Sequence, residues 1–335
     1  RFAHADTNAP PCSGDGWCGG TLRALTQRLD YIHDMGFDCL WITPVLEQSH
    51  SEECMGDWCG HAYHGYWPQN FYAIDPSFGT AEDLVALSRG LHDRDMCFVY
   101  DVVVNHVRPV HKTADLQAVV PFNQPSHFNA LNKKANESFD AYLSRKGYPN
   151  AISTFGCCGC SAGDLQCDGS EKYNQTVVER GWFFNLADLN TSDTFVASEL
   201  RQWIRQMVAN YSIDAVRLDT APYVPRDFLA SFQEADGVEI FGEITTSNFT
   251  YLASYLQDPA YGRVLRGVFN FKIVWALRDS FCPPPSEGSN DEAQPSGSSF
   301  SGGSSFSGGS SFSGGRSESS GSGGRLDKLA SVLQE

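Results

Sequence analysis

Two carboxylates, Asp219 and Glu243, each follow a short apolar run that is typical of a β-strand. Arg217 lies two residues before Asp219, so on a strand both side chains point to the same face, and its charge keeps the carboxylate ionised as a nucleophile. Glu243 follows an apolar strand and a glycine, surroundings that favour a partly protonated carboxyl group. One carboxylate that attacks and one acid that protonates the leaving oxygen are the pair that glycoside hydrolysis needs. Carboxylates at strand ends also occur as loop charges without a catalytic part, so the pair by itself leaves both interpretations open.

The segments around this pair predict the elements that position it. Strands are expected at 38–44, 97–106, 215–219 and 239–243. Apolar residues recur at helical spacing in 22–35, 84–91 and 196–208, the last preceded by the cap Thr191-Ser192-Asp193. Strands that alternate with helices and carry polar residues at their C-terminal ends are typical of a parallel α/β fold. In a (β/α)8 barrel the active site is built at that end of the strands.

Several of these segments resemble, in order, the motifs of the α-amylase family, glycoside hydrolase family 13. The matching stretches are Asp-Val-Val-Val-Asn-His at 101–106, Ile-Asp-Ala-Val-Arg-Leu-Asp-Thr at 213–220 and Phe-Gly-Glu at 241–243. The stretches that resemble secreted fungal-type α-amylases in particular are 18–21, 41–44, 62–67 and 210–214. The similarity covers roughly residues 1 to 282 and returns in 325–335. It implies an α/β fold, a (β/α)8 TIM barrel with a domain inserted after the third strand.

The resemblance implies a role for each catalytic residue. Asp219 is expected to be the nucleophile that forms a covalent glycosyl-enzyme, and Glu243 the general acid that later acts as base. Arg217 is expected to hold Asp219 ionised. The reaction implied is hydrolysis of α-1,4-glucosidic bonds in starch, glycogen or maltooligosaccharides with retention of configuration.

The resemblance also implies a set of sugar-binding residues, namely His64, Tyr66, Trp67, His106 and Arg217. The two histidines are expected to hydrogen-bond the sugar in the cleavage subsite, and Tyr66 to stack on its ring. A pyranose has an apolar C–H face that suits an aromatic side chain. Aromatic and histidine residues are also typical of a core or its rim, and that alternative stands beside the binding role.

A structural calcium ion is a further implication of the resemblance, and calcium prefers several oxygen ligands. Asn105, Glu179 and Asp188 are expected to supply side-chain oxygens, and Tyr223 its backbone carbonyl. Ala221-Pro222-Tyr223 stands where many family members have an apolar residue followed by Lys-His. A carbonyl ligand survives this change, whereas the substrate contacts that the Lys and His usually make do not carry over to this chain.

The expected domain organisation follows from the motifs and from changes in composition. Residues 1–107 and 186–282 are expected to form the catalytic barrel, and 108–185 the inserted, calcium-associated domain, because loops that long in a compact domain are usually functional. Residues 283–324 are rich in Ser and Gly and cannot bury a core, so we expect a disordered insertion there. Residues 325–335 return to helical spacing and are expected to be a fragment of a barrel helix.

Parts of the family pattern are not recognised in the chain. The family has a His-Asp pair on its seventh strand, but the last histidine here is His127. The first strand, the last two strands and the C-terminal β-domain are also not found. We therefore expect a fragment of an α-amylase that is inactive alone. Two other functions stay open: a relative that acts on short α-glucosides or transfers glucosyl units, and a non-catalytic glucan-binding homologue, which would be expected to lose the carboxylates that this chain keeps.

Composition restricts the partners. The chain has 335 residues and a formal net charge of -16, which argues against nucleic acid and anionic membranes as partners. No apolar run approaches the length of a transmembrane helix. The resemblance, rather than the composition, implies an α-glucan as the partner, and we expect a monomer to bind it. No signal peptide is found at the start, Arg1-Phe2-Ala3, so a targeting segment would have to be removed or not included.

Cysteine usage indicates an extracellular location. Of the 11 cysteines, those that lie in polar loop sequence are typical of disulfides in a secreted protein: Cys12, Cys18, Cys54, Cys59, Cys157, Cys158, Cys160 and Cys167. A zinc site at 157–167 is the alternative for the last group. Cys39 and Cys97 fall inside strands and are expected to be buried free thiols. Five glycosylation sequons agree with secretion, at Asn136, Asn174, Asn190, Asn210 and Asn248.

Overall fold

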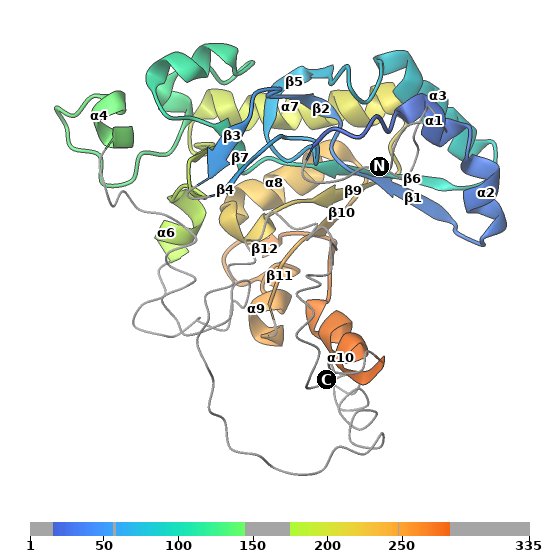
Figure 1. Ribbon diagram of the computed structural model, residues 1–335. Helices are drawn as coiled ribbons and strands as arrows, with labels where there is room; N and C mark the ends of the chain where they lie inside the picture. Colours follow the sequence, from blue (N-terminus) through green and yellow to red (C-terminus); the bar gives the residue numbers. More distant parts are fainter. Residues whose placement is uncertain (1–15, 56–57, 145–174, 247, 282–335) are drawn as a thin grey trace, which may run out of the picture.

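A parallel sheet of five strands forms the centre of the described part of the protein (Figure 1). The computed structural model describes residues 16–55, 58–144, 175–246 and 248–281. In spatial order the strands are β1 (Cys39–Ile42), β6 (Cys97–Val102), β9 (Ala215–Leu218), β10 (Glu239–Gly242) and β13 (Gly267–Val268). All are parallel, and their order in the sheet is their order in the chain. The C-terminal ends of the strands therefore lie along one edge.

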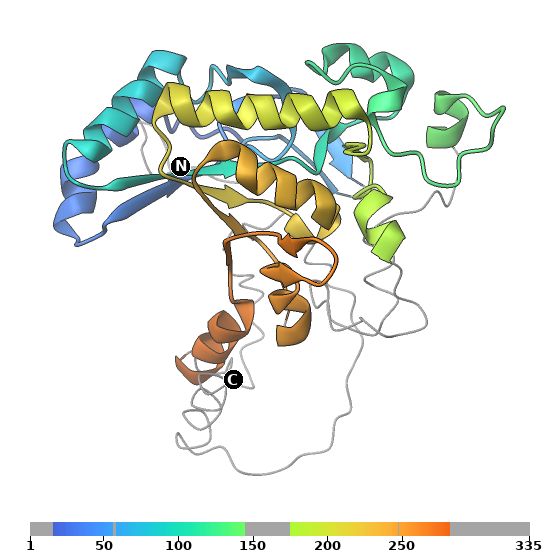
Figure 2. The same cartoon turned by 180° about the vertical axis from the view of Figure 1, so that it is seen from behind.

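Three helices lie side by side over one face of this sheet, α3 (Ala81–His92), α7 (Thr194–Tyr211) and α8 (Arg226–Asp236) (Figures 1 and 2). The side chain of Asp193 caps α7 by accepting hydrogen bonds from the N–H groups of Phe195 and Val196, as the sequence predicts. The apolar pattern over 22–35 forms two short helices rather than one, α1 (Leu22–Thr26) and α2 (Leu29–Asp34). The helical face of that pattern is thus divided between two elements.

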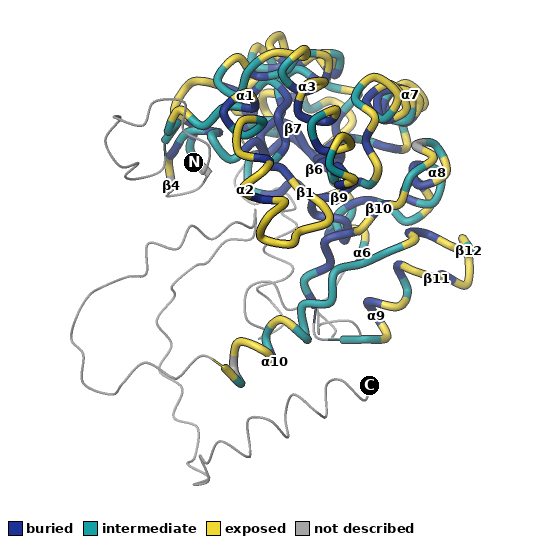
Figure 3. Tube along the Cα trace, turned by 90° about the vertical axis from the view of Figure 1, so that its right-hand side faces the viewer, coloured by how far each residue is buried: buried dark blue, intermediate teal, exposed yellow. Residues whose placement is uncertain are grey.

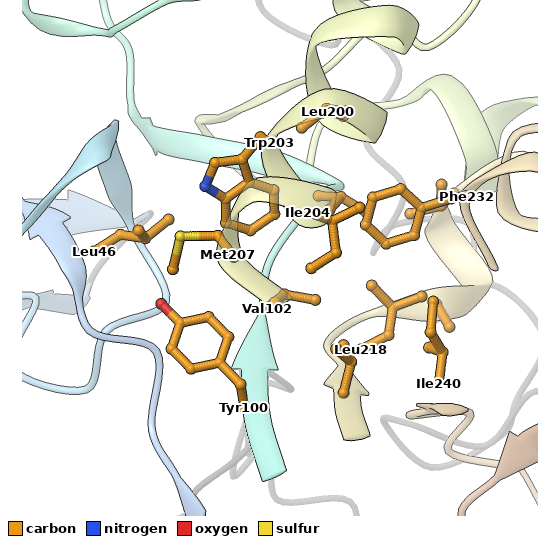
Figure 4. Packing of buried hydrophobic residues seen from close by; sticks show 14 of the residues in the cluster. Leu46, Tyr100, Val102, Leu200, Trp203, Ile204, Met207, Leu218, Phe232 and Ile240 are labelled. Carbon is orange, nitrogen blue, oxygen red and sulfur yellow. The ribbon is translucent and has the colours of Figure 1, made fainter. Parts of the chain in front are cut away.

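Alternation along the strands divides the sheet into two faces. Tyr100, Val102, Leu218 and Ile240 are buried against the helices, where Trp203 and Ile204 of α7 pack on them (Figure 4). Burying one such side chain contributes about 1.5–3 kcal/mol. The helix-covered face therefore fixes the orientation of each strand, and the intervening residues point to the opposite face. In Figure 3 the tube is largely buried along β6 and β9, and the residues that follow the C-terminal ends of β6, β9 and β10 are buried as well.

Smaller elements surround the sheet. Antiparallel pairs are formed by β2 (Leu46–Gln48) with β5 (Pro68–Ile74), β3 (Glu53–Met55) with β4 (Trp58–Gly60), β7 (His106–Pro109) with β8 (Leu186–Asp188), and β11 (Gln257–Asp258) with β12 (Gly262–Arg263). The remaining helices are η1 (Thr113–Ala118), η2 (Pro125–His127), α4 (Phe139–Ser144), α6 (Gln175–Arg180), η3 (Ala221–Tyr223), α9 (Phe249–Ala253) and α10 (Phe271–Phe281). Among the helices described, none is long and apolar enough to cross a membrane.

The predicted strand 97–106 is shorter in the structure. It ends at Val102, and His106 already begins β7, which turns away from the sheet to pair with β8. Asn105 and His106 are therefore placed beside β8 rather than on the barrel strand. The predicted boundaries of the inserted domain at 108 and 185 stay predictions.

A disulfide joins Cys39 and Cys97, with their Cα atoms 4.4 Å apart. The prediction that these residues are buried free thiols is wrong, because Cys39 is exposed and pairs directly with Cys97 in the β1–β6 register. Both are the first residues of their strands and lie on the face away from the helices, so membership of a strand did not mean burial. Cys54 and Cys59 form the disulfide expected of polar-segment cysteines, across the β3–β4 hairpin. Cys12, the cysteines at 157–167, Asn174 and residues 283–335 lie outside the described residues.

Candidate active site

The C-terminal ends of β6, β9 and β10 bring the expected catalytic carboxylates together. The backbone N–H of Asp219 donates to the Val102 carbonyl at 3.0 Å, and that of Glu243 to the Leu218 carbonyl at 2.8 Å. Each bond extends the parallel ladder by one residue beyond the strand. Both side chains are buried and project from the face opposite the helices.

Arg217 holds both carboxylates with one guanidinium. Its Nη1 is 2.7 Å from Asp219 Oδ1, and its Nη2 is 2.8 Å from Glu243 Oε2. Nη1 is also 3.0 Å from Asp101 Oδ1. Burial by itself lowers the pKa of Arg217, and the charges of the three carboxylates more than offset this. The guanidinium therefore stays charged and fixes the separation of Asp219 and Glu243.

Asp101 is the first residue of the motif at 101–106, but the sequence alone did not indicate a role for it. It is completely buried, and its Oδ2 accepts hydrogen bonds from Trp41 Nε1 at 3.0 Å and from the Tyr66 hydroxyl at 2.9 Å. Burial raises its pKa to about 7, while Arg217 acts to lower it. The available signal was its position, since Asp101 ends a strand beside the one that carries Arg217.

Glu243 has the surroundings of a general acid. Burial and the charge of Asp219 together raise its pKa to about 7, although Arg217 partly counters both. The N–H of Thr220 donates to its Oε2 at 3.2 Å. A Cβ atom at the preceding Gly242 would lie 2.6 Å from Leu265 Cδ1, so a larger residue there would require the Leu265 side chain to move.

His64, Tyr66 and Trp67 lie in the connection between β4 and β5. The backbone N–H of Tyr66 donates to His64 Nδ1 at 3.0 Å, so neutral His64 carries its proton on Nε2. Burial lowers the pKa of His64 to about 4. The rings of His64 and Tyr66 stack with centroids 5.7 Å apart. Trp67 is buried and contacts the His64 ring edge-on at 4.9 Å, so the structure places it as a support for His64.

His106 is buried beside the same connection. Its Nε2 is 2.9 Å from the carbonyl oxygen of Tyr66, and burial lowers its pKa. A neutral ring that donates from Nε2 leaves Nδ1 as an acceptor, and this atom is 3.2 Å from the side-chain amide of Asn105. His106 thus links the β4–β5 connection to Asn105.

Three of the four expected calcium ligands converge. One heteroatom of the Asn105 amide is 3.0 Å from the Tyr223 carbonyl oxygen and 3.1 Å from Asp188 Oδ1. If that heteroatom is nitrogen, it donates to both; if it is oxygen, three oxygens face one point. The second arrangement gives His106 Nδ1 the donor that it needs, and it is a donor set that suits calcium. Asp188 is buried, which raises its pKa, so a nearby cation would stabilise its ionised form.

Glu179, the fourth expected ligand, lies on α6 and accepts a hydrogen bond from Gln175 Nε2 at 2.6 Å. Burial raises its pKa, and the charge of Arg226 acts to lower it. Within the described ranges, no group of three or more His, Cys, Asp or Glu side chains forms a metal cluster. The convergent set therefore consists of one carboxylate, one amide and one carbonyl.

Comparison with known proteins agrees with this geometry. The family described as "Alpha amylase, catalytic domain" matches residues 1–270. This chain belongs to the α-amylase family. It is 34% identical over 290 residues to alpha-amylase 2 of Schwanniomyces occidentalis, covering 83% of this chain and 48% of that protein. It is 33% identical over 294 residues to an alpha-amylase of Saccharomycopsis fibuligera, covering 86% and 51%.

A solved α-amylase structure from Malbranchea cinnamomea superimposes with a TM-score of 0.62 at 32% sequence identity, covering 81% of this chain and 49% of that one. The expected (β/α)8 architecture is thereby confirmed: the parallel sheet and its helices are part of the α-amylase barrel. The chain spans about half the length of the curated α-amylases that it matches.

Proposed function

We propose that this chain contributes the nucleophile and the general acid to hydrolysis of α-1,4-glucosidic bonds in starch-like glucans with retention of configuration, an activity expected of the full-length enzyme, which is the protein to test, rather than of these residues alone. The observation that carries the proposal is the pair of contacts from one guanidinium, at 2.7 Å to Asp219 and 2.8 Å to Glu243. Retaining enzymes hold their two carboxyl groups about 5–5.5 Å apart, whereas inverting enzymes leave about 6.5–9.5 Å for a water molecule. Two carboxyl groups held by the terminal nitrogens of one guanidinium favour the close arrangement.

The steps follow from the two environments. Asp219, ionised beside Arg217, attacks the anomeric carbon, and protonated Glu243 gives its proton to the departing glycosidic oxygen. Glu243 then takes a proton from water as the water displaces Asp219 from the anomeric carbon. His64 offers its Nε2–H to a sugar hydroxyl, and Tyr66 and His106 complete the subsite. The proteins that this chain resembles are named α-amylases, which favours glucans over other sugars.

Calcium binding is part of the same proposal. Asn105, Asp188 and the Tyr223 carbonyl would hold the ion, with Glu179 as a further ligand after a change of its side-chain position. The ion would stabilise the contact between β7, β8 and η3 and supplies no step of the reaction. The buried carboxylate of Asp188 supports this assignment, as does the Nδ1 acceptor that a neutral His106 ring presents to the Asn105 amide nitrogen.

Secretion and glycosylation also belong to the proposal. Two disulfides in the described residues favour an oxidising compartment. Of the sequon asparagines, Asn136 and Asn210 are exposed. The side chains of Asn190 and Asn248 instead accept backbone hydrogen bonds, from Ser192 and Tyr251. We propose that the protein acts as a monomer.

A fluorinated maltosyl fluoride tests the nucleophile directly, because fluoride leaves without an acid. Asp219 should attack the anomeric carbon, release fluoride and retain the sugar, which peptide mass spectrometry would locate. The Glu243→Gln variant should still be labelled but should lose hydrolysis of starch and maltooligosaccharides. Glu239→Gln, an exposed carboxylate on the same strand, is the matched control and should behave as the native protein.

Absence of label on Asp219 would contradict the proposal. If such a protein still bound starch, it would be a non-catalytic glucan-binding homologue. Labelling together with transfer of the sugar to another glucan instead of water would indicate a glucosyl-transferring relative.

A further inference from the structure

Trp41 lies on β1, outside the motifs that carry the carboxylates, and its side chain reaches into the site. It pairs with Val99 in the β1–β6 register, and Asp101 is the next residue of β6 on the same face. The indole is 49% exposed, so core burial does not explain its placement. Its Nε1–H donates to Asp101 Oδ2 at 3.0 Å.

The two oxygens of Asp101 have separate partners. Oδ2 accepts from Trp41 and from the Tyr66 hydroxyl, at 3.0 and 2.9 Å, while Oδ1 is 3.0 Å from Arg217 Nη1. The two donors hold the carboxylate rotated so that Oδ1 faces the guanidinium. They also favour the ionised form of a carboxyl group that is completely buried.

The same two rings flank Arg217. Its Cζ atom is 5.4 Å from the centroid of the Trp41 ring and 5.6 Å from that of Tyr66, within cation–π range. Arg217 Nε is buried and has no hydrogen-bond partner among the described residues. The orientation of the guanidinium therefore depends on its Nη contacts and on the two rings.

We propose that Trp41 is a positioning residue: through its N–H on Asp101 and its ring beside Arg217, it sets the guanidinium that holds Asp219 and Glu243. The inference rests on the proposed function, because Asp219 must be the nucleophile for this placement to affect a rate. Without the indole N–H, Asp101 has one donor fewer on Oδ2 and can turn, and Arg217 turns with it. Asp219 is then held less firmly for its attack.

Trp41→Phe keeps a ring beside Arg217 and removes only the N–H. We expect the maximal rate of Asp219 labelling by the fluorinated maltosyl fluoride to fall about tenfold, which corresponds to about 1.4 kcal/mol and suits one hydrogen bond to a charged group. The reagent concentration that gives half the maximal rate should stay unchanged, because Trp41 is not placed against the sugar.

Phe269→Leu is the matched control. Phe269 stacks on the Trp41 ring, with centroids 5.7 Å apart, and its loss removes packing but leaves the N–H. The control should label Asp219 at the native rate. Equal losses of labelling rate in both variants would overturn the proposal, because packing alone would then explain the role of Trp41. An unchanged labelling rate in Trp41→Phe would also overturn it, because the indole N–H would then have no effect.

A substrate-free measurement separates this inference from the proposed function. The Trp41 indole N–H resonance, identified by its absence in Trp41→Phe, should shift more in an Asp101→Asn variant than in Phe269→Leu, where only the ring-current effect of Phe269 is lost. If the native protein is not labelled at Asp219, the proposed function fails. The resonance then still tests whether the Trp41 N–H binds Asp101. An indole N–H resonance that does not shift in Asp101→Asn would overturn the inference even in an active enzyme.

Discussion

Gly65 lies directly against the carbonyl oxygen of Pro44, so closely that a Cβ atom at residue 65 would fall on that oxygen. The glycine has φ +89°, in the left-handed region. It separates His64 from Tyr66, and the Thr43 hydroxyl donates to the His64 carbonyl on the same side. This close approach is what brings the His64 and Tyr66 rings over the end of β1.

Gly65→Ala should therefore lower the free energy of unfolding by more than backbone strain alone would. Gly36 has a similar φ of +84°, but a Cβ atom there meets nothing within 4 Å. We expect Gly36→Ala to lower the free energy of unfolding by about 1–2 kcal/mol, the cost of the left-handed conformation alone. Gly65→Ala should lose clearly more, because Pro44 must also move. Urea unfolding of the two variants checks this, and equal losses would contradict the close approach.

The raised pKa of Glu243 predicts a pH dependence of stability. The carboxyl group has a pKa of about 7 when folded and about 4.3 when unfolded. Between these values the folded state binds more protons, so the free energy of unfolding should fall as pH rises from about 4 to about 7. For this group alone the fall is about 4 kcal/mol at most.

Urea unfolding between about pH 4 and about pH 8 measures this slope. Glu243→Gln cannot ionise and should lose that part of the slope, while Asp101 retains its own. Glu239→Gln removes an exposed carboxyl group from the same strand and should keep the native profile. If Glu243→Gln kept the native dependence of the free energy of unfolding on pH, titration of Glu243 would not be its cause.

Calcium removal should destabilise the folded protein if Asn105, Asp188 and the Tyr223 carbonyl hold the ion. A ligand present at about 100 times its dissociation constant adds about 2.7 kcal/mol to the free energy of unfolding. A chelator should therefore lower the melting temperature of the native protein but not that of Asp188→Asn. Asp140→Asn, which changes an exposed carboxylate between β7 and β8, should keep the native response. The same melting temperature with and without chelator would count against the site.

The disulfide between Cys39 and Cys97 should contribute more stability than that between Cys54 and Cys59. The sequence separations are 58 and 5 residues, and a cross-link that closes a longer loop removes more entropy from the unfolded chain. On that account Cys39→Ser with Cys97→Ser should lose about 4 kcal/mol, and the short-loop pair of serines about 2 kcal/mol. Denaturant unfolding of both double variants compares them; a larger loss in the short-loop pair would contradict this order.

Local patterns allowed most of the sheet and the central pair of carboxylates to be predicted. An apolar run followed by Asp219 or Glu243 predicts both a strand and the carboxylate at its end. The strands that the structure confirms therefore also place these two carboxylates. Trp41 and Asp101 were not assigned a role, because their contact depends on which strands are neighbours. The same is true of Cys39 and Cys97, whose pairing follows from the β1–β6 register.

Glu179 is a residue whose predicted role the sequence indicated but whose side-chain direction it did not. Its motif position implied a ligand, but the hydrogen bond to Gln175 is made within α6. The direction of a side chain on a short helix depends on the residues that pack around it, here including Arg226. Sequence spacing carries no information on that choice.

The strands occur in the sheet in the order in which they are synthesised. A chain that leaves the ribosome from its N-terminus can add each strand to an edge that the previous strand has just formed, and no strand has to enter between two others. Asp101 emerges before Arg217, and Arg217 before Glu243. The guanidinium therefore meets the Asp101 carboxylate already in place when it is first buried, its own strand adds Asp219, and the later strand adds Glu243. The direction of synthesis is thus also the order in which the charged groups of the site are assembled.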